Sequence, residues 1–163
     1  MSESDNGNIN LDTMSLDQLN NLKQQEEGRL QALTNRYSQL RAAAARLNAS
    51  QMAVSEFSPA LEGKEVMIPL TGSLYVPGKI KDCNKLLVDI GTGFYVEKTP
   101  KDTKSFLERK IKLVDANSEN ITTVIQVTRQ NIEQVTLAMQ GKLVEIRARQ
   151  EGRMRQAIDA QES

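Results

Sequence analysis

Hydrophobic residues recur at alternating intervals of three and four positions in two long stretches of the chain. The first runs from Leu16 to Val54 and the second from Leu107 to Ile146. This spacing is typical of the seam of a coiled coil, in which one narrow stripe of each helix is covered by its partner. We therefore expect two long helices, over residues 15–57 and 100–156, that pack against each other.

Polar residues and prolines mark the expected ends of these helices. Asp12 or Ser15 can cap the first helix, and Ser58-Pro59 disfavours its continuation. Thr99 can cap the second helix, because Pro100 suits the first helical position and Asp102 stands three residues after the cap. Each predicted helix therefore has a start signal of its own.

Two polar residues interrupt the first seam. Lys23 and Glu26 occupy positions where apolar residues are expected, and Gly28 lies close by. Charged seam residues and a helical glycine both weaken a coiled coil. We expect looser packing here than in the rest of the pair.

Between the helices lies an internal repeat of a different kind. Residues 66–76 align with residues 86–96, and each copy is an apolar run, a turn of small residues and a second apolar run. This is the pattern of a β-hairpin, present twice. The predicted fold is α+β, a long antiparallel two-helix coiled coil joined by two β-hairpins. The expected segments are a disordered tail (1–14), a helix (15–57), the double hairpin (58–99), a helix (100–156) and a C-terminal tail (157–163).

The predicted hairpins cannot bury all their apolar side chains within one chain. Apolar residues alternate along each strand, but the opposite face also carries Met67, Tyr75, Leu87 and Tyr95. A two-stranded hairpin is marginally stable alone, and its outer edges expose unpaired backbone groups. We therefore expect an oligomerisation module that joins sheets from other chains into a β-barrel. Its expected contact residues are Val66, Ile68, Leu70, Leu74, Tyr75, Val76, Val88, Ile90, Phe94, Tyr95 and Val96.

Composition excludes several classes of function. The chain has no histidine and one cysteine, which removes the usual zinc ligands and the commonest general base. Its 21 basic and 21 acidic residues balance, so net charge gives no reason to expect nucleic acid or a membrane as partner. The first ten residues lack a signal region, and no apolar run approaches the roughly 20 residues needed to span a bilayer. The lone cysteine fits a reducing compartment, so the cytosol is the expected location, with the nucleus as the alternative.

No catalytic, cofactor-binding or metal-binding residue is predicted. Gly91-Thr92-Gly93 is followed by another strand instead of the helix that a phosphate loop requires, so a glycine-dependent hairpin turn is favoured. Cys83 has no histidine beside it to activate the thiol. The arginines of residues 147–155 alternate with glutamates and have no aromatic neighbour for base stacking, which favours a solvated helix face.

The free ends of the coiled coil are the remaining candidate for a binding site. Apolar residues from both ends of the chain should meet there, and methionine repacks easily around varied partners. These side chains either belong to a frayed tip without a role or form an adaptable surface for exposed apolar segments. The candidates are Leu11, Met14, Leu16, Ile146, Met154 and Ile158.

The hairpin segments also carry a family resemblance. Residues 66–78 and 87–98, between two helices of this length, resemble an α-class prefoldin subunit, and the resemblance covers about residues 16–146. The α class has two hairpins between its helices, whereas the β class has one. These two segments are specific to the family, whereas the coiled-coil parts are generic.

The resemblance implies a partnership and an activity that composition does not. Prefoldin is a heterohexamer of two α-class and four β-class subunits whose hairpins build a double β-barrel. Its coiled-coil tips hold unfolded proteins, notably actin and tubulin, and transfer them to the cytosolic chaperonin without using ATP or another cofactor. The alternative is a coiled-coil structural adaptor that docks folded partners, and an enzyme ranks third.

Overall fold

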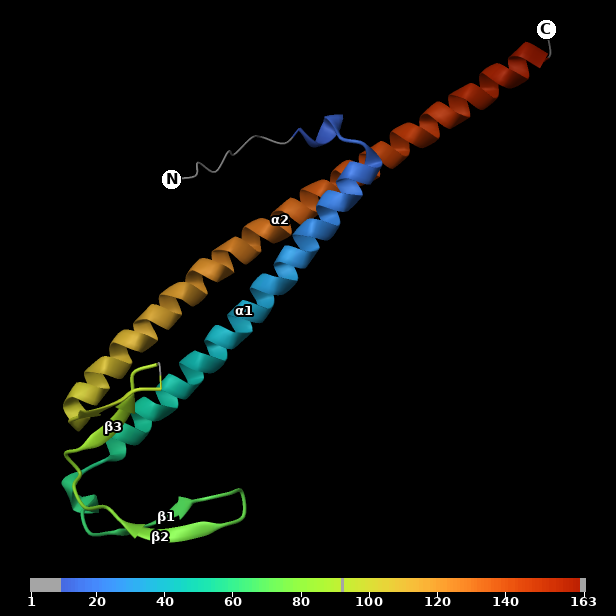
Figure 1. The fold of residues 1–163 in the computed structure, drawn as a ribbon. Helices are drawn as coiled ribbons and strands as arrows, with labels where there is room; N and C mark the ends of the chain where they lie inside the picture. The colour runs from blue at the N-terminus through green and yellow to red at the C-terminus, as the bar shows by residue number, and fades with distance from the viewer. Residues whose placement is uncertain (1–9, 92, 162–163) are drawn as a thin grey trace. The chain divides into compact units, whose positions relative to one another are not determined.

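The computed structural model describes residues 10–91 and 93–161 (Figure 1). It contains two long helices and two antiparallel β-hairpins, which confirms the predicted fold class. In chain order the elements are η1 (Leu11–Thr13), α1 (Leu16–Glu56), η2 (Pro59–Leu61), β1 (Glu65–Pro69), β2 (Tyr75–Lys79), β3 (Leu86–Asp89), β4 (Tyr95–Lys98) and α2 (Pro100–Gln161). The chain divides into two compact units, residues 1–37 with 120–163 and residues 38–119.

Both predicted tails contain helical structure. Helix α2 continues to Gln161, five residues beyond the predicted end at 156, so the C-terminal tail assigned to residues 157–163 is helical over 157–161. The reason is that no glycine or proline follows Gly152, and alanine at 157 and 160 favours helix. In the N-terminal tail the 3₁₀ turn η1 begins after Asn10, whose side chain accepts a hydrogen bond from Asp12 N. Residues 1–9 of that predicted disordered tail lie outside the described residues.

Reciprocal hydrogen bonds cap both long helices. Ser15 Oγ accepts from Gln18 N, and Gln18 Oε1 accepts from Ser15 N, so Ser15 and not Asp12 is the cap of α1. At α2, Thr99 Oγ1 accepts from Asp102 N and donates to the Asp102 carboxylate. The predicted start of α2 is thereby confirmed.

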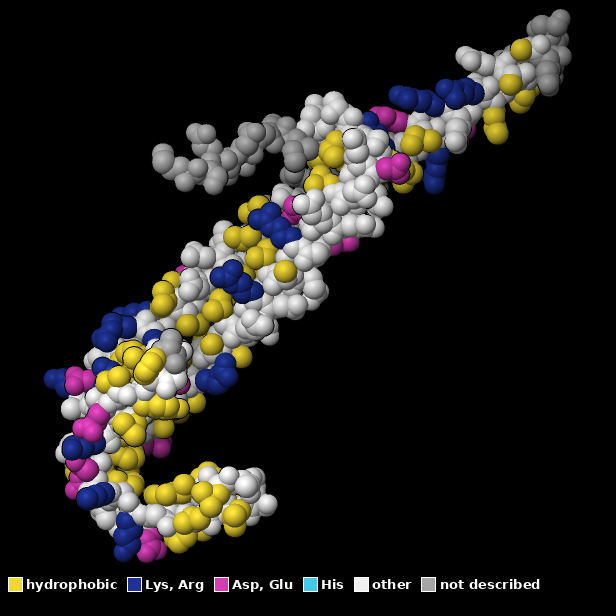
Figure 2. Space-filling view, viewed as in Figure 1, with side chains coloured by type: hydrophobic (Ala, Val, Ile, Leu, Met, Phe, Trp, Pro, Cys, Tyr) yellow, Lys and Arg dark blue, Asp and Glu magenta, His cyan; other side chains and the backbone are white. Residues whose placement is uncertain are grey.

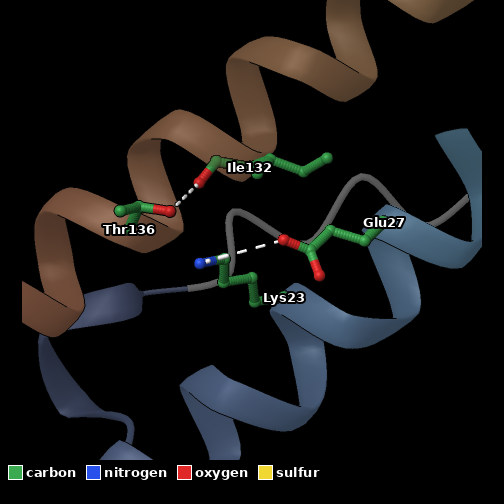
Figure 3. A network of polar contacts seen from close by, with 4 residues as sticks. All are labelled: Lys23, Glu27, Ile132 and Thr136. Carbon is green, nitrogen blue, oxygen red and sulfur yellow. Dashed lines mark hydrogen bonds and ion pairs between the residues drawn. The ribbon is translucent and has the colours of Figure 1, made fainter.

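In the unit that contains the N-terminal half of α1, the helices lie side by side and antiparallel (Figures 1 and 3). Lys142 Nζ of α2 donates to the carbonyl of Asp12, just before α1 begins. The predicted seam is confirmed here, because all of its members except Ile146 are buried or half-buried, and Leu19 is completely buried. Its covered members on α1 and α2 are Leu16, Leu19, Lys23, Glu26, Leu30, Leu33, Tyr37, Ile121, Ile125, Thr128, Ile132, Val135, Met139 and Lys142.

The polar interruption of this seam forms ion pairs within α1 but leaves one carboxylate oxygen without a partner. Lys23 Nζ lies 3.8 Å from Glu27 Oε1 on α1, beside Thr136 of α2, whose hydroxyl donates to the Ile132 carbonyl at 2.7 Å (Figure 3). Glu26 Oε1 is 3.9 Å from an Arg29 nitrogen, while its Oε2 is buried with no hydrogen-bond partner. A buried carboxylate oxygen without a partner costs free energy of folding.

Replacing Glu26 by leucine should therefore stabilise the helix pair by about 1–2 kcal/mol, because it removes the desolvation cost and extends the apolar seam. Urea unfolding of the full chain, followed by far-UV circular dichroism, measures the change. Gln25→Leu, at the adjacent exposed position, is the control and should change stability by less than about 0.5 kcal/mol. Equal effects of the two substitutions, or a loss of stability in Glu26→Leu, would contradict the assignment.

In the unit of residues 38–119, the same stripe continues on each helix segment. Ala44, Leu107 and Ser118 are buried, and the intervening seam positions are half-buried. The hairpins form two separate two-stranded sheets, β1 with β2 and β3 with β4. The turn of the second hairpin has positive φ at Gly91 (114°) and Gly93 (77°), which confirms the predicted glycine turn.

Both strand prolines occupy positions that preserve the ladder of the first hairpin. Pro69 ends β1, whereas Pro77 lies inside β2 opposite Met67. Because Leu70 N donates to Leu74 O, hydrogen-bonded pairs alternate from that point and the Met67–Pro77 pair is a non-bonded one. The missing N–H of Pro77 therefore falls on the free edge of β2, where a proline removes no ladder hydrogen bond.

Candidate functional site

Each hairpin has one side that consists mainly of apolar side chains, which we call the apolar face. Register pairs Ile68 with Val76 in the first hairpin and Val88 with Val96 in the second, so alternate residues of paired strands share a face. The twenty-residue repeat places equivalent side chains on equivalent faces. The apolar face consists of Val66, Ile68, Leu70, Leu74 and Val76 in the first hairpin and Leu86, Val88, Ile90, Phe94 and Val96 in the second.

The opposite side of each hairpin, which we call the mixed face, combines apolar and charged residues. It carries Glu65, Met67, Tyr75 and Lys79 in the first hairpin, and Leu87, Asp89, Tyr95 and Glu97 in the second. The carboxylate of Glu65 lies 3.9 Å from Lys79 Nζ, and that of Glu97 lies 3.8 Å from Lys85 Nζ. These charged groups are well exposed and suit contact with water.

The eleven predicted oligomerisation residues separate between these faces. Nine lie on the apolar face, whereas Tyr75 and Tyr95 lie on the mixed face. All except the half-buried Val88 are exposed in the chain alone, and Phe94 exposes 69% of its surface. Figure 2 shows hydrophobic side chains on the surface of the hairpins. The prediction omitted Leu86, although it follows Val66 by twenty positions and the repeat itself identifies it.

Gly78 gives the first hairpin room for its apolar face. It lies opposite Val66 in register, and a Cβ atom built on it would be 2.6 Å from Ile68 Cδ1. The Ile68 side chain therefore lies across the neighbouring strand in space that any other residue at 78 would fill. In the second hairpin the equivalent position is the half-buried Lys98.

The connection between the hairpins is held by hydrogen bonds around the buried Cys83. Glu62 Oε1 accepts a hydrogen bond from Cys83 N at 3.0 Å. In the backbone, Ile80 N donates to Lys64 O, and Gly63 N donates to Ile80 O. Cys83 is 2% exposed, and burial, with the nearby Glu62 and Asp82 carboxylates adding to it, raises the pKa of its thiol. Burial and a raised pKa both disfavour the reactive thiolate form of Cys83.

The free edges of the strands offer a second set of contacts. In the second hairpin, Ile90 N donates to Phe94 O, so the N–H groups of Leu87, Asp89, Tyr95 and Glu97 face away from the partner strand. None of these residues is proline, and both edges of this hairpin therefore keep their donors. A strand from another chain can pair along them.

The six predicted tip residues fall into two groups. Leu11, Met14 and Leu16 are half-buried, whereas Ile146, Met154 and Ile158 are exposed, with Met154 70% exposed. The difference arises because α1 begins at Leu16, while α2 continues for nineteen residues past Lys142. Leu143 and Val144 are also exposed beside this end and were not predicted. Their apolar character in the sequence was the available signal.

Within residues 10–91 and 93–161, no helix has the length and apolar character needed to cross a membrane. In those same ranges, no three histidine, cysteine or acidic side chains gather as a metal site would require.

Comparison with known proteins agrees with this architecture. The family model described as prefoldin subunit matches residues 22–145. Prefoldin subunit 5 from Arabidopsis thaliana is 35% identical over 85% of this chain and 91% of its own length. Human prefoldin subunit 5 is 34% identical over 86% of this chain and 91% of its own. The chain belongs to the prefoldin subunit family.

A solved structure shares the fold. A chain from the cryo-EM structure of filamentous PFD from Methanocaldococcus jannaschii superposes with a TM-score of 0.63 at 20% identity. The match covers 71% of the present chain and 95% of that chain. At this identity the likeness concerns the arrangement of helices and hairpins alone.

Proposed function

We propose that this chain is an α-class subunit of a hexameric cytosolic co-chaperone that holds unfolded proteins at the ends of its coiled coils. In this proposal it joins another α-class and four β-class subunits through its hairpins, which build a β-barrel. The complex captures unfolded actin and tubulin without ATP and transfers them to the cytosolic chaperonin. Capture makes and breaks no covalent bond, so no catalytic residue is assigned.

The observation that carries this proposal is the unpaired end of α2. Beyond Lys142 the helix no longer has α1 beside it, and Ile146, Met154 and Ile158 expose between 41% and 70% of their surface. Isolated apolar side chains of this kind bind exposed apolar segments weakly. Several arms that act together raise the total affinity through effective concentration, while each contact stays weak enough to release the client.

The experiment is to dilute denatured actin into buffer with and without the assembled six-subunit complex, in the absence of nucleotide. Light scattering should fall as the complex approaches an equimolar amount. Native actin is the control and should not bind, because its apolar segments are buried. Binding of native but not denatured protein would instead support the structural adaptor.

A further inference from the structure

The short segment that precedes α1 lies against α2 at the end of the helix pair. It contains the turn η1, and Lys142 Nζ of α2 donates a hydrogen bond to the carbonyl of Asp12 (Figure 1). Lys142 is half-buried, whereas every residue of α2 from Leu143 to Ile158 is exposed. The segment therefore marks the point at which the cover of α2 ends. We call residues 10–15 the strap.

The strap has one apolar side, and that side is covered. Leu11 and Met14 are half-buried, whereas Asp12, Thr13 and Ser15 are exposed. In a 3₁₀ turn, side chains three positions apart lie one above the other, so Leu11 and Met14 share a face. The turn thus places both apolar side chains against the helix pair and its polar side chains in water.

The strap also accounts for the complete burial of Leu19. Leu30 and Leu33, further along the same helix pair, are half-buried, so α2 by itself does not cover a leucine of α1 completely. Leu19 is 0% exposed, although α1 begins only three residues before it. Met14 precedes the cap Ser15, and Leu19 is the fourth helical residue, which are the two positions of a hydrophobic staple. The strap is therefore a third element that closes the seam at its end.

We infer that the strap is an internal competitor of the client, which occupies the end of the seam until an apolar client segment displaces it. This inference rests on the proposed function and concerns the regulation of the same site. The strap has the features of a bound peptide, namely two apolar side chains on one face and a backbone carbonyl that accepts from Lys142. Every peptide has such carbonyls, so a client segment with two suitably spaced apolar residues can replace these contacts without a specific motif.

The contacts of the strap suit displacement. Its turn is closed by local backbone hydrogen bonds, which Thr13 N and Met14 N donate within the strap itself. A segment held by two half-buried side chains and one hydrogen bond from a side chain opens more readily than a packed helix. The surface that it covers adjoins apolar residues that are already exposed, since Leu143 and Ile146 follow Lys142 on α2. Displacement therefore enlarges the apolar surface at this end of the helix pair.

Hydrogen exchange in the assembled hexamer tests the displacement directly. In the parent without client, the amides of Thr13 and Met14 should be protected by the turn. With an equimolar amount of denatured actin, they should exchange at least about threefold faster, because displacement opens the turn. A gain of protection would mean that the client binds the strap itself, and unchanged exchange would mean that the strap stays closed. Either result overturns the inference.

Substitution of the two covered side chains tests the competition. Leu11→Ser with Met14→Ser weakens the strap and keeps the Ser15 cap of α1. This pair should lower the amount of hexamer that halves the aggregation of denatured actin by about twofold, because a larger fraction of this arm is open. Asp12→Ser with Thr13→Ser is the matched control on the exposed side of the same turn. It keeps the backbone carbonyl of residue 12 and should leave this amount unchanged.

The direction of the change separates three roles of the strap. If the Leu11 and Met14 pair holds less client than the parent, these side chains contact the client themselves; if it holds the same amount, the strap only caps α1. Both results overturn the inference and leave the proposed function standing. If the parent hexamer does not hold denatured actin, the proposed function fails and the inference fails with it. Native mass and helix content confirm that each variant assembles.

Discussion

Aspartate at Ile68 and Val88 should keep this chain out of the hexamer. Both side chains lie on the apolar face, at equivalent positions of β1 and β3. If that face lines the inside of a barrel, each new carboxylate must be buried without a partner, which costs at least about 2–3 kcal/mol and weakens association by roughly a hundredfold per site. Native mass after mixing with the other five subunits should show the variant unassembled.

The chain contains its own matched control for this experiment. Met67→Asp with Leu87→Asp makes the same chemical change one residue earlier on the same two strands, where the side chains belong to the mixed face. That face already carries Glu65 and Asp89, so further carboxylates there can remain in water. The control should enter the hexamer, and both variants should keep the helix content of the parent, because α1 and α2 do not depend on these residues.

Each other outcome has a definite meaning. If the control pair fails to assemble and the Ile68 and Val88 pair succeeds, the two faces are assigned the wrong way round. If both pairs assemble, the hairpins are not the contact through which this chain joins its partners. The experiment therefore tests the face assignment and the oligomerisation module separately.

The repeat in the sequence predicted the hairpins well because their determinants are local. Alternating apolar residues and glycines at the turn specify strand, turn and register together, so residues 66–76 and 86–96 could be paired without knowledge of the rest of the chain. The same alternation of apolar and polar residues was sufficient to distinguish the apolar face of each hairpin from its mixed face. Tyr75 and Tyr95 were predicted to take part in assembly, although strand periodicity places them on the face that also carries the charged residues.

The end of the coiled coil was harder to predict because its determinants are tertiary. The seam continues in sequence to Ile146, yet this residue is exposed, since α1 begins at Leu16 and no longer covers α2 at that point. The end of α2 carries no stop signal, so the fading of the apolar stripe gave too short a helix. Which tip residues are covered depends on the turn η1 before α1, and no periodicity describes that turn.

Removal of residues 149–163 should reduce the holding of denatured actin several-fold while the hexamer stays intact. The deletion takes away Met154 and Ile158, which are exposed on the unpaired end of α2, and leaves the seam and the hairpins unchanged. The loss of two weak apolar contacts from one of six arms lowers total affinity without abolishing it. Light scattering during dilution of denatured actin measures the effect, and native mass confirms the assembly.

A finer pair of substitutions keeps the length of the helix. Met154→Ser with Ile158→Ser should reproduce most of the loss, whereas Gln150→Ser with Gln156→Ser, on the same segment, should leave client holding unchanged. Deletion of residues 1–15 should act differently, because it removes the Ser15 cap and the half-buried Leu11 and Met14, and so should lower the stability of the helix pair. Unchanged suppression of aggregation after removal of both ends would mean that this subunit does not hold clients at the end of its coiled coil.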